Sequence, residues 1–503
     1  MASYLSEASS IAPLLAVSAG LGLTFLLFKS RRNEVPKNTI GNAPYPPVIP
    51  SMIPFLGSAV EFGQGIAAFI EKHSALLENS PIVTATIAGK NMHLVADPAA
   101  FPSAFRYSEA NLSMVPVIQD FSKSFFGMTP SGLESFDRKG IRTLMEHMLH
   151  PAGLSDVTNT IQRAFKNHLN SIDTSKSHDL HTFINQTMFR GVLETIISKS
   201  VSNEMFIEAY EAFEKAMPLA MVGLPMKIFA NSSYKAREAI TRLLIDENLE
   251  LSSYLKDRRD LLREKGMTIV DVARDNLLWT WGSVSNFIPA LFWYLYFVAN
   301  IEDAVLAIRK EVQALIAKSD RSTDETILFT TDELDNMKAL DSTFKETLRV
   351  TLRFPITRQV MKDMEIDLRL KYKPSKYFLK EGDHIMLFMP ILHEDPAIYP
   401  NPKEYQWDRF MHPGHSYTTA NGEQIVDPFR PFGGGAHFCP GRKFAVNAAK
   451  SFLGNLLWKY NVKITGTTEP DLARDGIGVL HPKDPVELLL QDRFPKSPEI
   501  MKR

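Results

Sequence analysis

Apolar side chains recur every three or four positions along residues 206–213 and again along residues 302–316. This spacing places them on one face of a helix, so both segments are predicted to be amphipathic helices. Short runs rich in β-branched and aliphatic residues at 82–87, 94–96 and 486–490 predict strands. The pattern as a whole predicts a mainly helical fold with small β-sheets. The helical apolar positions are Phe206, Tyr210 and Phe213 in the first segment and Val305, Ile308, Val312 and Leu315 in the second.

Residues 11–28 form a run of 18 positions without a charged side chain. A helix of this length spans about 27 Å, close to the roughly 30 Å hydrocarbon core of a membrane. Lys29, Arg31 and Arg32 follow the run, and this positive charge predicts that residues 1–10 lie outside the cytosol and the rest of the chain inside it. A cleaved signal peptide is the alternative, but no Lys or Arg precedes the run. We therefore expect a single-pass transmembrane anchor.

The anchor is followed by a basic and proline-rich segment, residues 29–54, which contains six prolines. Proline at this density favours a stiff, extended linker over a helix. Neither a second linker of this kind nor an internal repeat interrupts residues 55–503. That stretch is therefore expected to form one large domain.

Residues 277–299 contain no charged side chain over 23 positions and would pass for a second membrane span by hydropathy alone. Their middle, however, holds polar and helix-breaking residues, which are costly in lipid unless they face protein. A helix that crosses the centre of a large domain is also apolar all round. We expect the buried helix. The interrupting residues are Gly282, Ser283, Ser285, Asn286 and Pro289.

The composition is that of a folded protein, with 45% hydrophobic and 22% charged residues. Lys and Arg total 56 against 57 for Asp and Glu, so no global positive field is present to attract nucleic acid. Cys439 is the only cysteine, which excludes a disulfide within the chain and a zinc site with two or more thiolates. A single thiol is either inert or functional, and its surroundings decide between the two.

Cys439 follows a run of three glycines and precedes a pattern of apolar residues at every fourth position, beginning at Phe444. Backbone N–H groups at the start of a helix can hold a thiolate as an anion, and glycines let the backbone turn closely around the sulfur. Phe432 and Phe438 supply an apolar cover. A phosphate-binding loop would need Gly-Lys-Ser/Thr after the glycines, and this is absent. The segment therefore predicts a metal-binding thiolate at a helix start.

The pattern Phe432-x-x-Gly435-x-x-x-Cys439-x-Gly441 resembles the haem-binding signature of the cytochrome P450 family. The resemblance implies the cytochrome P450 fold with an N-terminal transmembrane helix. It also implies haem b as the cofactor, with Cys439 as the axial thiolate ligand of its iron. The resemblance covers essentially the whole chain, because further motifs of the family occur in the right order.

Two of these motifs concern charged residues. Glu346 and Arg349 match the family's Glu-x-x-Arg helix, and residues 405–410 resemble the segment that contributes a further arginine, here Arg409. The resemblance implies that the three form a buried charge network that locks the core behind the haem. In isolation such a pair is more often a solvated surface couple.

The propionates of a haem need cationic partners or strong hydrogen-bond donors. Where the family usually has Arg two residues before the cysteine, this chain has His437, which can donate a hydrogen bond without a fixed charge. The family's Trp-x-x-x-Arg helix is matched by Arg138 and Arg142, with Arg142 in the arginine position. Arg358 is a further candidate. An ordinary surface role stays open for His437, Arg142 and Arg358.

On the oxygen side, residues 277–299 resemble the distal helix that runs over the haem, where the family carries an acid and an alcohol that relay protons. This chain has Ser285 in the acid position and Asn286 in the alcohol position. An Asn side chain can hold a water or a substrate oxygen, so Ser285 and Asn286 are the candidate catalytic residues. The alternative makes Asn286 a kink residue beside Pro289.

Asn286-x-x-Pro289-Ala290 and the segment 475–482 are similar to a sub-group of the family that includes sterol 7α- and 12α-hydroxylases and prostacyclin synthase. This sub-group divides between hydroxylation, which uses oxygen and electrons, and peroxide isomerisation, which uses neither. The resemblance favours a large, mostly apolar, polycyclic substrate. The residues expected to line its pocket are Val284, Asn286, Phe354, Ile356, Ile477 and Val479.

Together these features predict a haem-dependent monooxygenase of the endoplasmic reticulum membrane that hydroxylates a sterol- or terpenoid-like compound in the cytosol-facing domain. The chain contains no nicotinamide- or flavin-binding motif, so electrons are expected from a separate NADPH–cytochrome P450 reductase, with cytochrome b5 as a second candidate partner. The closest alternative is a haem-thiolate isomerase or dehydratase that acts on a peroxide or epoxide without a redox partner. Another is a membrane-tethered lipid or haem carrier.

Overall fold

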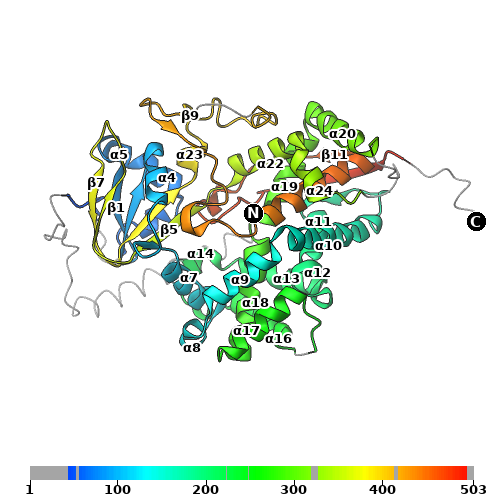
Figure 1. Ribbon diagram of the computed structural model, residues 1–503, viewed down its shortest axis with the longest axis horizontal. Helices are drawn as coiled ribbons and strands as arrows, with labels where there is room; N and C mark the ends of the chain where they lie inside the picture. Colours follow the sequence, from blue (N-terminus) through cyan, green and yellow to red (C-terminus); the bar gives the residue numbers. More distant parts are fainter. Residues whose placement is uncertain are drawn as a thin grey trace, which may run out of the picture.

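The computed structural model describes residues 43–51, 56–221, 224–246, 248–318, 327–412 and 417–494. The predicted anchor, residues 11–28, lies outside these ranges, as does the first part of the predicted linker. In the described part of the chain, a β-rich region stands at one end of the molecule and a larger helical region at the other (Figure 1). The predicted mainly helical fold with small sheets is confirmed.

The β-rich region is built round a five-stranded sheet. β2 and β8 pair in parallel, whereas the other neighbours in the sheet are antiparallel. β1 and β8 are buried along almost their whole length because both faces of the sheet are covered. In spatial order the strands are β1 (Ile82–Ile87), β2 (Lys90–Val95), β8 (His384–Phe388), β5 (Pro355–Val360) and β3 (Leu112–Ser113).

Three smaller sheets complete the β structure. They contain β11 (Tyr460–Thr465), β12 (Glu487–Asp492) and β4 (His178–Asp179) in the first, β6 (Met364–Asp367) and β7 (Lys376–Leu379) in the second, and β9 (Tyr417–Thr418) and β10 (Gln424–Ile425) in the third. β4 and β12 bring residues more than 300 positions apart into register, with Asp179 opposite Glu487.

Residues 43–51 pack against this β-rich region and do not form a free linker. The Ile49 N–H donates to the Thr84 carbonyl at 2.8 Å, and Ile49 is buried. The Phe378 N–H donates to the Pro44 carbonyl at 2.9 Å. The prediction that the domain starts at residue 55 is therefore wrong. Proline-rich sequence favours extended backbone, and here that extended backbone pairs with β1.

Helices make up most of the remaining chain. Those of the first half are α3 (Ala59–Phe62), α4 (Ile66–Lys72), α5 (Ser74–Asn79), α6 (Phe101–Phe105), α7 (Val115–Phe121), α8 (Pro130–Glu134), α9 (Arg138–Met148), α10 (Pro151–Asn170), α11 (Leu180–Ile184), α12 (Arg190–Ile196), α13 (Glu204–Glu214), α14 (Met217–Met221) and α15 (Met226–Phe229). Those of the second half are α16 (Asn231–Ile245), α17 (Ser253–Glu264), α18 (Ile269–Val284), α19 (Phe287–Ala299), α20 (Glu302–Ile316), α21 (Thr331–Asn336), α22 (Lys338–Thr351), α23 (Pro390–His393) and α24 (Arg442–Lys459).

The predicted periodic elements are confirmed. α13 and α20 cover the two segments with helical spacing, and α20 has the predicted bounds. β1 also has its predicted bounds, whereas β2 begins earlier and β12 begins and ends later than predicted. The helix expected after Cys439 is α24.

The apolar segment 277–299 lies in the core, although not as one continuous helix. α18 ends at Val284 and α19 begins at Phe287, so Ser285 and Asn286 form a break. Pro289 has no N–H to donate to the carbonyl of Ser285, which explains the interruption. α18 and α19 together are long and apolar enough to cross a membrane, but most of this stretch is buried inside the protein. α19 packs against α20, α22 and α24, as Figure 1 also shows.

Candidate active site

Cys439 lies in a tight loop that leads into α24. Its N–H donates to the Phe432 carbonyl at 2.9 Å, which closes the loop. Gly435 has a φ of +66°, and a Cβ atom there would lie 2.3 Å from the Phe105 carbonyl oxygen. Only glycine fits this left-handed position against a neighbouring backbone. Gly441, in contrast, has open space around it and caps the start of α24.

The thiol of Cys439 faces the open side of this loop, and the residue as a whole is exposed. The chain packed around the sulfur nevertheless excludes enough water to raise the pKa of the thiol. The N–H groups of Gly441 and Arg442 and the charge of Arg442 act in the opposite direction and lower that pKa. The protein thus provides donors for a thiolate, and a bound cation is needed to stabilise it fully. Phe438 is 39% exposed, and the guanidinium of Arg442 lies over its ring at 4.7 Å from the centroid.

Arg358 tests whether the site fits a haem. The residue is fully buried on β5, and its Nη2 donates to the Gly434 carbonyl at 2.8 Å. Its Nε and Nη1 atoms are buried without any partner in the described part of the chain. Burial lowers the pKa of the guanidinium, and the charge of Glu109 opposes this shift without cancelling it. A buried cation of this kind requires an anionic partner, and a haem propionate supplies one beside the Cys439 loop. The residues therefore fit the group.

His437 lies in the same place and is held in one tautomer. Its Nε2 accepts from the Met114 N–H at 3.3 Å, so the ring proton lies on Nδ1. Burial lowers the pKa of His437, and the nearby charges of Arg358 and Arg138 lower it further, so the ring is neutral at physiological pH. Its Nδ1 lies 3.4 Å from Glu109 Oε1.

Arg138, and not Arg142, is the arginine of α9 that reaches this region. Arg138 Nη1 donates to Glu109 Oε2 at 3.0 Å, and Arg138 Nη2 lies 3.5 Å from His437 Nδ1. Arg142 pairs with Glu146 on the outer face of the same helix, where 71% of its side chain is exposed. The expectation that Arg142 faces the haem is corrected accordingly. Positions 138 and 142 are about one turn apart, but the first turn of α9 alone faces the Cys439 loop.

Glu346, Arg349 and Arg409 are brought together behind the Cys439 loop. Arg349 Nε and Nη2 each donate to one oxygen of Glu346 at 2.8 Å, and Arg409 Nε donates to the same carboxylate at 3.0 Å. The remaining N–H groups of Arg349 donate to the carbonyls of His393, Pro402 and Glu404. Glu346 and Arg349 are buried, and every donor of the Arg349 fork has an acceptor.

Asn286 connects the break between α18 and α19 to the C-terminal loop, residues 472–482. Its Oδ1 accepts from the Val479 N–H at 2.9 Å. Gly478 has a φ of +156°, and a Cβ atom there would lie 2.2 Å from the same oxygen. The loop continues alongside the end of α22, since the Arg353 N–H donates to the Gly478 carbonyl at 2.8 Å. Asn286 therefore fixes the loop through a contact for which only glycine leaves room.

The other residues expected to line a substrate pocket come from three segments. Val284 ends α18 and is buried, and Ile356 is buried on β5 near the Cys439 loop. Phe354 packs between the helical and β-rich cores. Ile477 and Val479 lie on the C-terminal loop, where Val479 forms a bridge to Leu352. These residues are apolar, and they come from the distal helix, from β5 and the residue before it, and from the loop.

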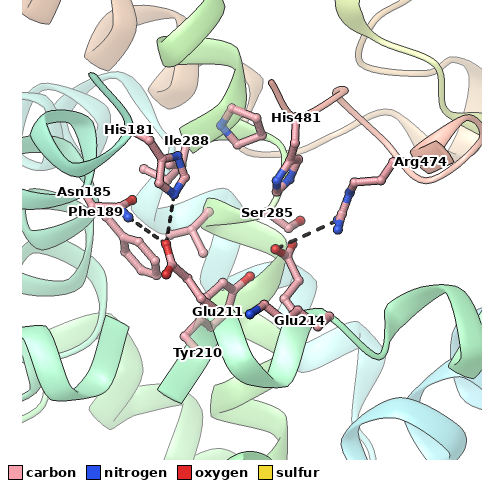
Figure 2. Close-up of a pocket in the computed structure, with 13 residues that line it drawn as sticks. His181, Asn185, Phe189, Tyr210, Glu211, Glu214, Ser285, Ile288, Arg474 and His481 are labelled. Carbon is pink, nitrogen blue, oxygen red and sulfur yellow. Dashed lines mark hydrogen bonds and ion pairs between the residues drawn. The ribbon is translucent and has the colours of Figure 1, made fainter. Parts of the chain in front are cut away.

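Ser285 faces a polar cavity on the other side of the break. Its Oγ is buried and has no partner among the described residues. Glu214 of α13 and Arg474 of the C-terminal loop also line this cavity, as Figure 2 shows. Sequence patterns gave no signal for Glu214, because its helical periodicity places it beside the apolar face of α13. Glu109 was equally without a signal.

A single cysteine thiol at a helix start, beside a buried arginine with two unpartnered donor atoms, fits a haem-thiolate site. A predominantly helical domain with one small β-rich region surrounds it. Among the described residues no cluster of His, Cys, Asp and Glu could hold a metal by itself.

The comparison with known families agrees with this class. Residues 46–490 match the family model described as Cytochrome P450. The chain belongs to the cytochrome P450 family, whose members are haem-thiolate enzymes, and the protein is a P450 monooxygenase with haem as its cofactor.

Several curated relatives match over nearly the full length. Cytochrome P450 7B1 of Mus musculus is 26% identical over 95% of this chain and 96% of its own. Cholesterol 7-alpha-monooxygenase of Cricetulus griseus is 25% identical over 88% of this chain and 92% of its own. Prostacyclin synthase of Rattus norvegicus is 24% identical over 89% of this chain and 94% of its own. The suspected sub-group is therefore confirmed.

Proposed function

We propose that this P450 hydroxylates a lipophilic, sterol- or terpenoid-like substrate with molecular oxygen and electrons from an NADPH-dependent reductase. The observation that carries the proposal is the near full-length similarity to a cholesterol 7-alpha-monooxygenase. The apolar residues at the break between α18 and α19, on β5 and on the C-terminal loop are consistent with a substrate of this class.

In this proposal Cys439 is the axial ligand, since it is the only cysteine of the chain. When bound, the haem supplies oxygen activation, and the thiolate pushes electron density toward O–O cleavage. Arg358 is the main partner for a propionate because its Nε and Nη1 are otherwise orphaned. His437 lies beside it as a neutral ring whose Nδ1 faces Glu109. Glu346, Arg349 and Arg409 hold the backbone behind the cysteine loop in place.

The residues on the distal side orient the substrate and exclude water from it. Asn286 Oδ1 holds the Val479 N–H and so fixes the C-terminal loop against the distal helix. Val284, Ile356 and Val479 then present apolar surface from three different segments. A rigid apolar wall of this kind selects a bulky hydrocarbon skeleton and positions one of its C–H bonds.

The proposed electron donor is a separate flavin reductase, NADPH–cytochrome P450 reductase, with cytochrome b5 as a second partner. It would dock on the face that carries the Cys439 loop, where Lys443 is exposed and Arg442 is partly exposed at the start of α24. We further propose that residues 11–28 anchor the chain in the endoplasmic reticulum membrane as a single-pass segment, with the catalytic domain in the cytosol.

A second candidate function is isomerisation of a peroxide or epoxide without a redox partner. Two observations favour it: the break in the distal helix carries no acid, with Ser285 and Asn286 in its place, and prostacyclin synthase is among the relatives. Hydroxylation consumes protons and electrons, whereas isomerisation consumes neither, so the two functions differ in stoichiometry.

The test combines a binding screen with a stoichiometry measurement. Sterols, triterpenes and fatty acids are screened for a substrate-induced spin shift of the purified full-length protein. The best binder is then incubated with purified reductase, and NADPH, oxygen and product are measured together. We expect all three to rise in proportion, with no product when the reductase is omitted. Product without reductase would overturn the hydroxylase proposal in favour of the isomerase.

A further inference from the structure

A cavity of about 230 Å³, lined by charged and polar side chains as well as apolar ones, lies beside the break in the distal helix. Its wall is formed by α11 and the turn after it, by α13, by Ser285 at the break, and by the C-terminal loop (Figure 2). A cavity of this size holds several water molecules, because each takes roughly 30 Å³.

The polar groups of the cavity fall into two sets. In the first set Glu211 is fully engaged: His181 Nε2 lies 2.9 Å from its carboxylate, and Asn185 Nδ2 donates to it at 2.7 Å. The second set consists of buried atoms without a partner in the described chain. They are Tyr210 Oη, Glu214 Oε1, Ser285 Oγ, Arg474 Nε, His481 Nε2 and Asn185 Oδ1. Since buried polar atoms are rarely left unpaired, these six indicate ordered water or a ligand in the cavity.

Ser285 occupies a special position in this second set. It stands in the break between α18 and α19. The carbonyl of Ser285 lacks the usual helical donor, because residue 289 is a proline without an N–H. A serine hydroxyl can accept a proton and donate another, but it cannot store one as an acid does. Figure 2 shows that Ser285 points into the cavity toward the carboxyl group of Glu214 on the facing helix.

Glu214 has the properties of a proton store. Only 7% of the residue is exposed, and burial raises the pKa of its carboxyl to about 7. The charge of Arg474, whose Nη2 lies 4.0 Å away, lowers this pKa, Glu211 raises it, and His181 lowers it. Tyr210, Lys215 and His481 also line the cavity, and burial lowers the pKa of His481 to about 3, so that ring stays neutral. An acid is most effective when its pKa lies close to the working pH.

We propose that Glu214 holds the proton that the distal pocket draws on, and that the Ser285 hydroxyl passes this proton across the helix break. The proposal rests on the proposed function, because hydroxylation with oxygen and two electrons consumes two protons and isomerisation consumes none. The carboxyl of Glu214, on a different helix, would thus act in place of the acid that the family carries at the position of Ser285.

The proton moves from Glu214 to the distal side through Ser285, and Glu214 is then protonated again from solvent. The O–H bond of the Glu214 carboxyl breaks as a cavity water or Ser285 Oγ accepts the proton, and Ser285 Oγ releases its own proton toward the distal side. The Glu214 carboxylate then regains a proton from solvent through the water-filled cavity. No electron moves in these steps, so the reductase remains the only source of electrons.

The test compares the wild-type protein with Glu214→Gln and Ser285→Ala, each full-length, haem-loaded and supplied with reductase. Glu208→Gln is the matched control, since Glu208 is an exposed carboxylate on the same helix. In the wild type we expect kcat to fall as the pH rises above about 7, as Glu214 loses its proton. In Glu214→Gln we expect kcat to fall about a hundredfold, the lower end of what a positioned acid contributes, and to lose this titration. KM is expected to stay the same.

Two further readouts separate the proposal from its rivals. Peroxide release per NADPH should rise in Glu214→Gln and Ser285→Ala but not in Glu208→Gln. The infrared C=O band of a protonated carboxyl should titrate near pH 7 and vanish in Glu214→Gln, with no turnover required.

An unchanged pH profile and unchanged coupling in Glu214→Gln would overturn the relay. So would a raised KM with an unchanged profile, which would make the cavity a binding site for a polar end of the substrate. Failure of the proposed function would show in the wild type itself, as product formed without NADPH, whereas failure of the relay alone would show only in the variants.

Discussion

Two buried polar clusters differ in how completely their hydrogen bonds are satisfied. Behind the cysteine loop, the Glu346 carboxylate and the Arg349 fork are fully paired. Beside the distal helix, Glu214, Ser285 and their neighbours keep free polar atoms. A complete network rigidifies the fold, whereas an incomplete one is available for water, protons or ligands. The first cluster is structural, and the second is positioned to take part in chemistry.

The largest expected effect is the loss of Arg349. Replacing it by Leu leaves the Glu346 carboxylate buried with Arg409 as its only remaining cation, and breaking a buried pair costs about 3–5 kcal/mol. We expect Arg349→Leu to abolish soluble, haem-loaded protein. Arg142→Leu, at an exposed arginine, is the control and should load haem normally. A folded and haem-loaded Arg349→Leu protein that is merely slower would show that the proximal network is not structural.

The next effect separates Arg358 from Arg142 as a haem partner. Arg358→Gln removes the buried cation whose Nε and Nη1 lack partners, so we expect haem to dissociate faster while the apoprotein keeps its helix content. Transfer of haem to an acceptor protein measures the dissociation rate, and circular dichroism measures the helix content. Arg142→Gln should match the wild type in both. Equal haem loss from the two variants would contradict the assignment of Arg358.

A smaller effect concerns stability and pH in the distal cluster. The pKa of Glu214 is raised to about 7 from an ordinary value of about 4.3, so the native state binds more protons than the unfolded state in this window. Stability is therefore lost as the pH rises from about 4.3 to 7. Glu214→Gln lacks this titration and should gain up to about 3 kcal/mol over the wild type between pH 4.5 and 8, measured from unfolding midpoints.

Glu211 on the same helix is the control, because its pKa is shifted in the opposite direction from that of Glu214. Burial raises the pKa of its carboxyl, but the hydrogen bond and charge of His181 outweigh burial and lower it. This pair contributes stability between the ordinary pKa values of Glu and His. That stability is lost as the pH falls through the lowered pKa of Glu211 or rises through the raised pKa of His181. Glu211→Gln should therefore be less stable than the wild type at about pH 6. If Glu214→Gln and Glu211→Gln changed stability relative to the wild type with the same pH trend, the distinction between the two carboxyls would be wrong.

The sequence predicted what depends on local periodicity and on fixed spacing. The helix of residues 302–316 and the strand of residues 82–87 have their predicted bounds, because the helical spacing of apolar residues marks the first and a short apolar, β-branched run marks the second. The glycines around Cys439 likewise predicted a tight turn before a helix. Pro289 was visible as a helix breaker, but the sequence did not show that α18 and α19 separate at Ser285.

What depends on long-range packing could not be predicted. Arg138 and Arg142 lie one turn apart, and only the packing of α9 against the Cys439 loop decides which one faces inward. Glu214 and Ser285 are 71 positions apart and meet only because α13 lies over the helix break. Residues 43–51 read as a linker because proline-rich sequence does not reveal which strand its extended backbone will join.

The measurement that tests the account most directly is the carbon monoxide difference spectrum of the reduced protein and its Cys439→Ser variant. The red-shifted band of a haem-thiolate protein requires a thiolate ligand, and Cys439 is the only thiol in the chain. We expect the wild type to show the band and Cys439→Ser to lose it while the far-ultraviolet dichroism is unchanged. An unchanged band in Cys439→Ser would contradict the haem-thiolate assignment.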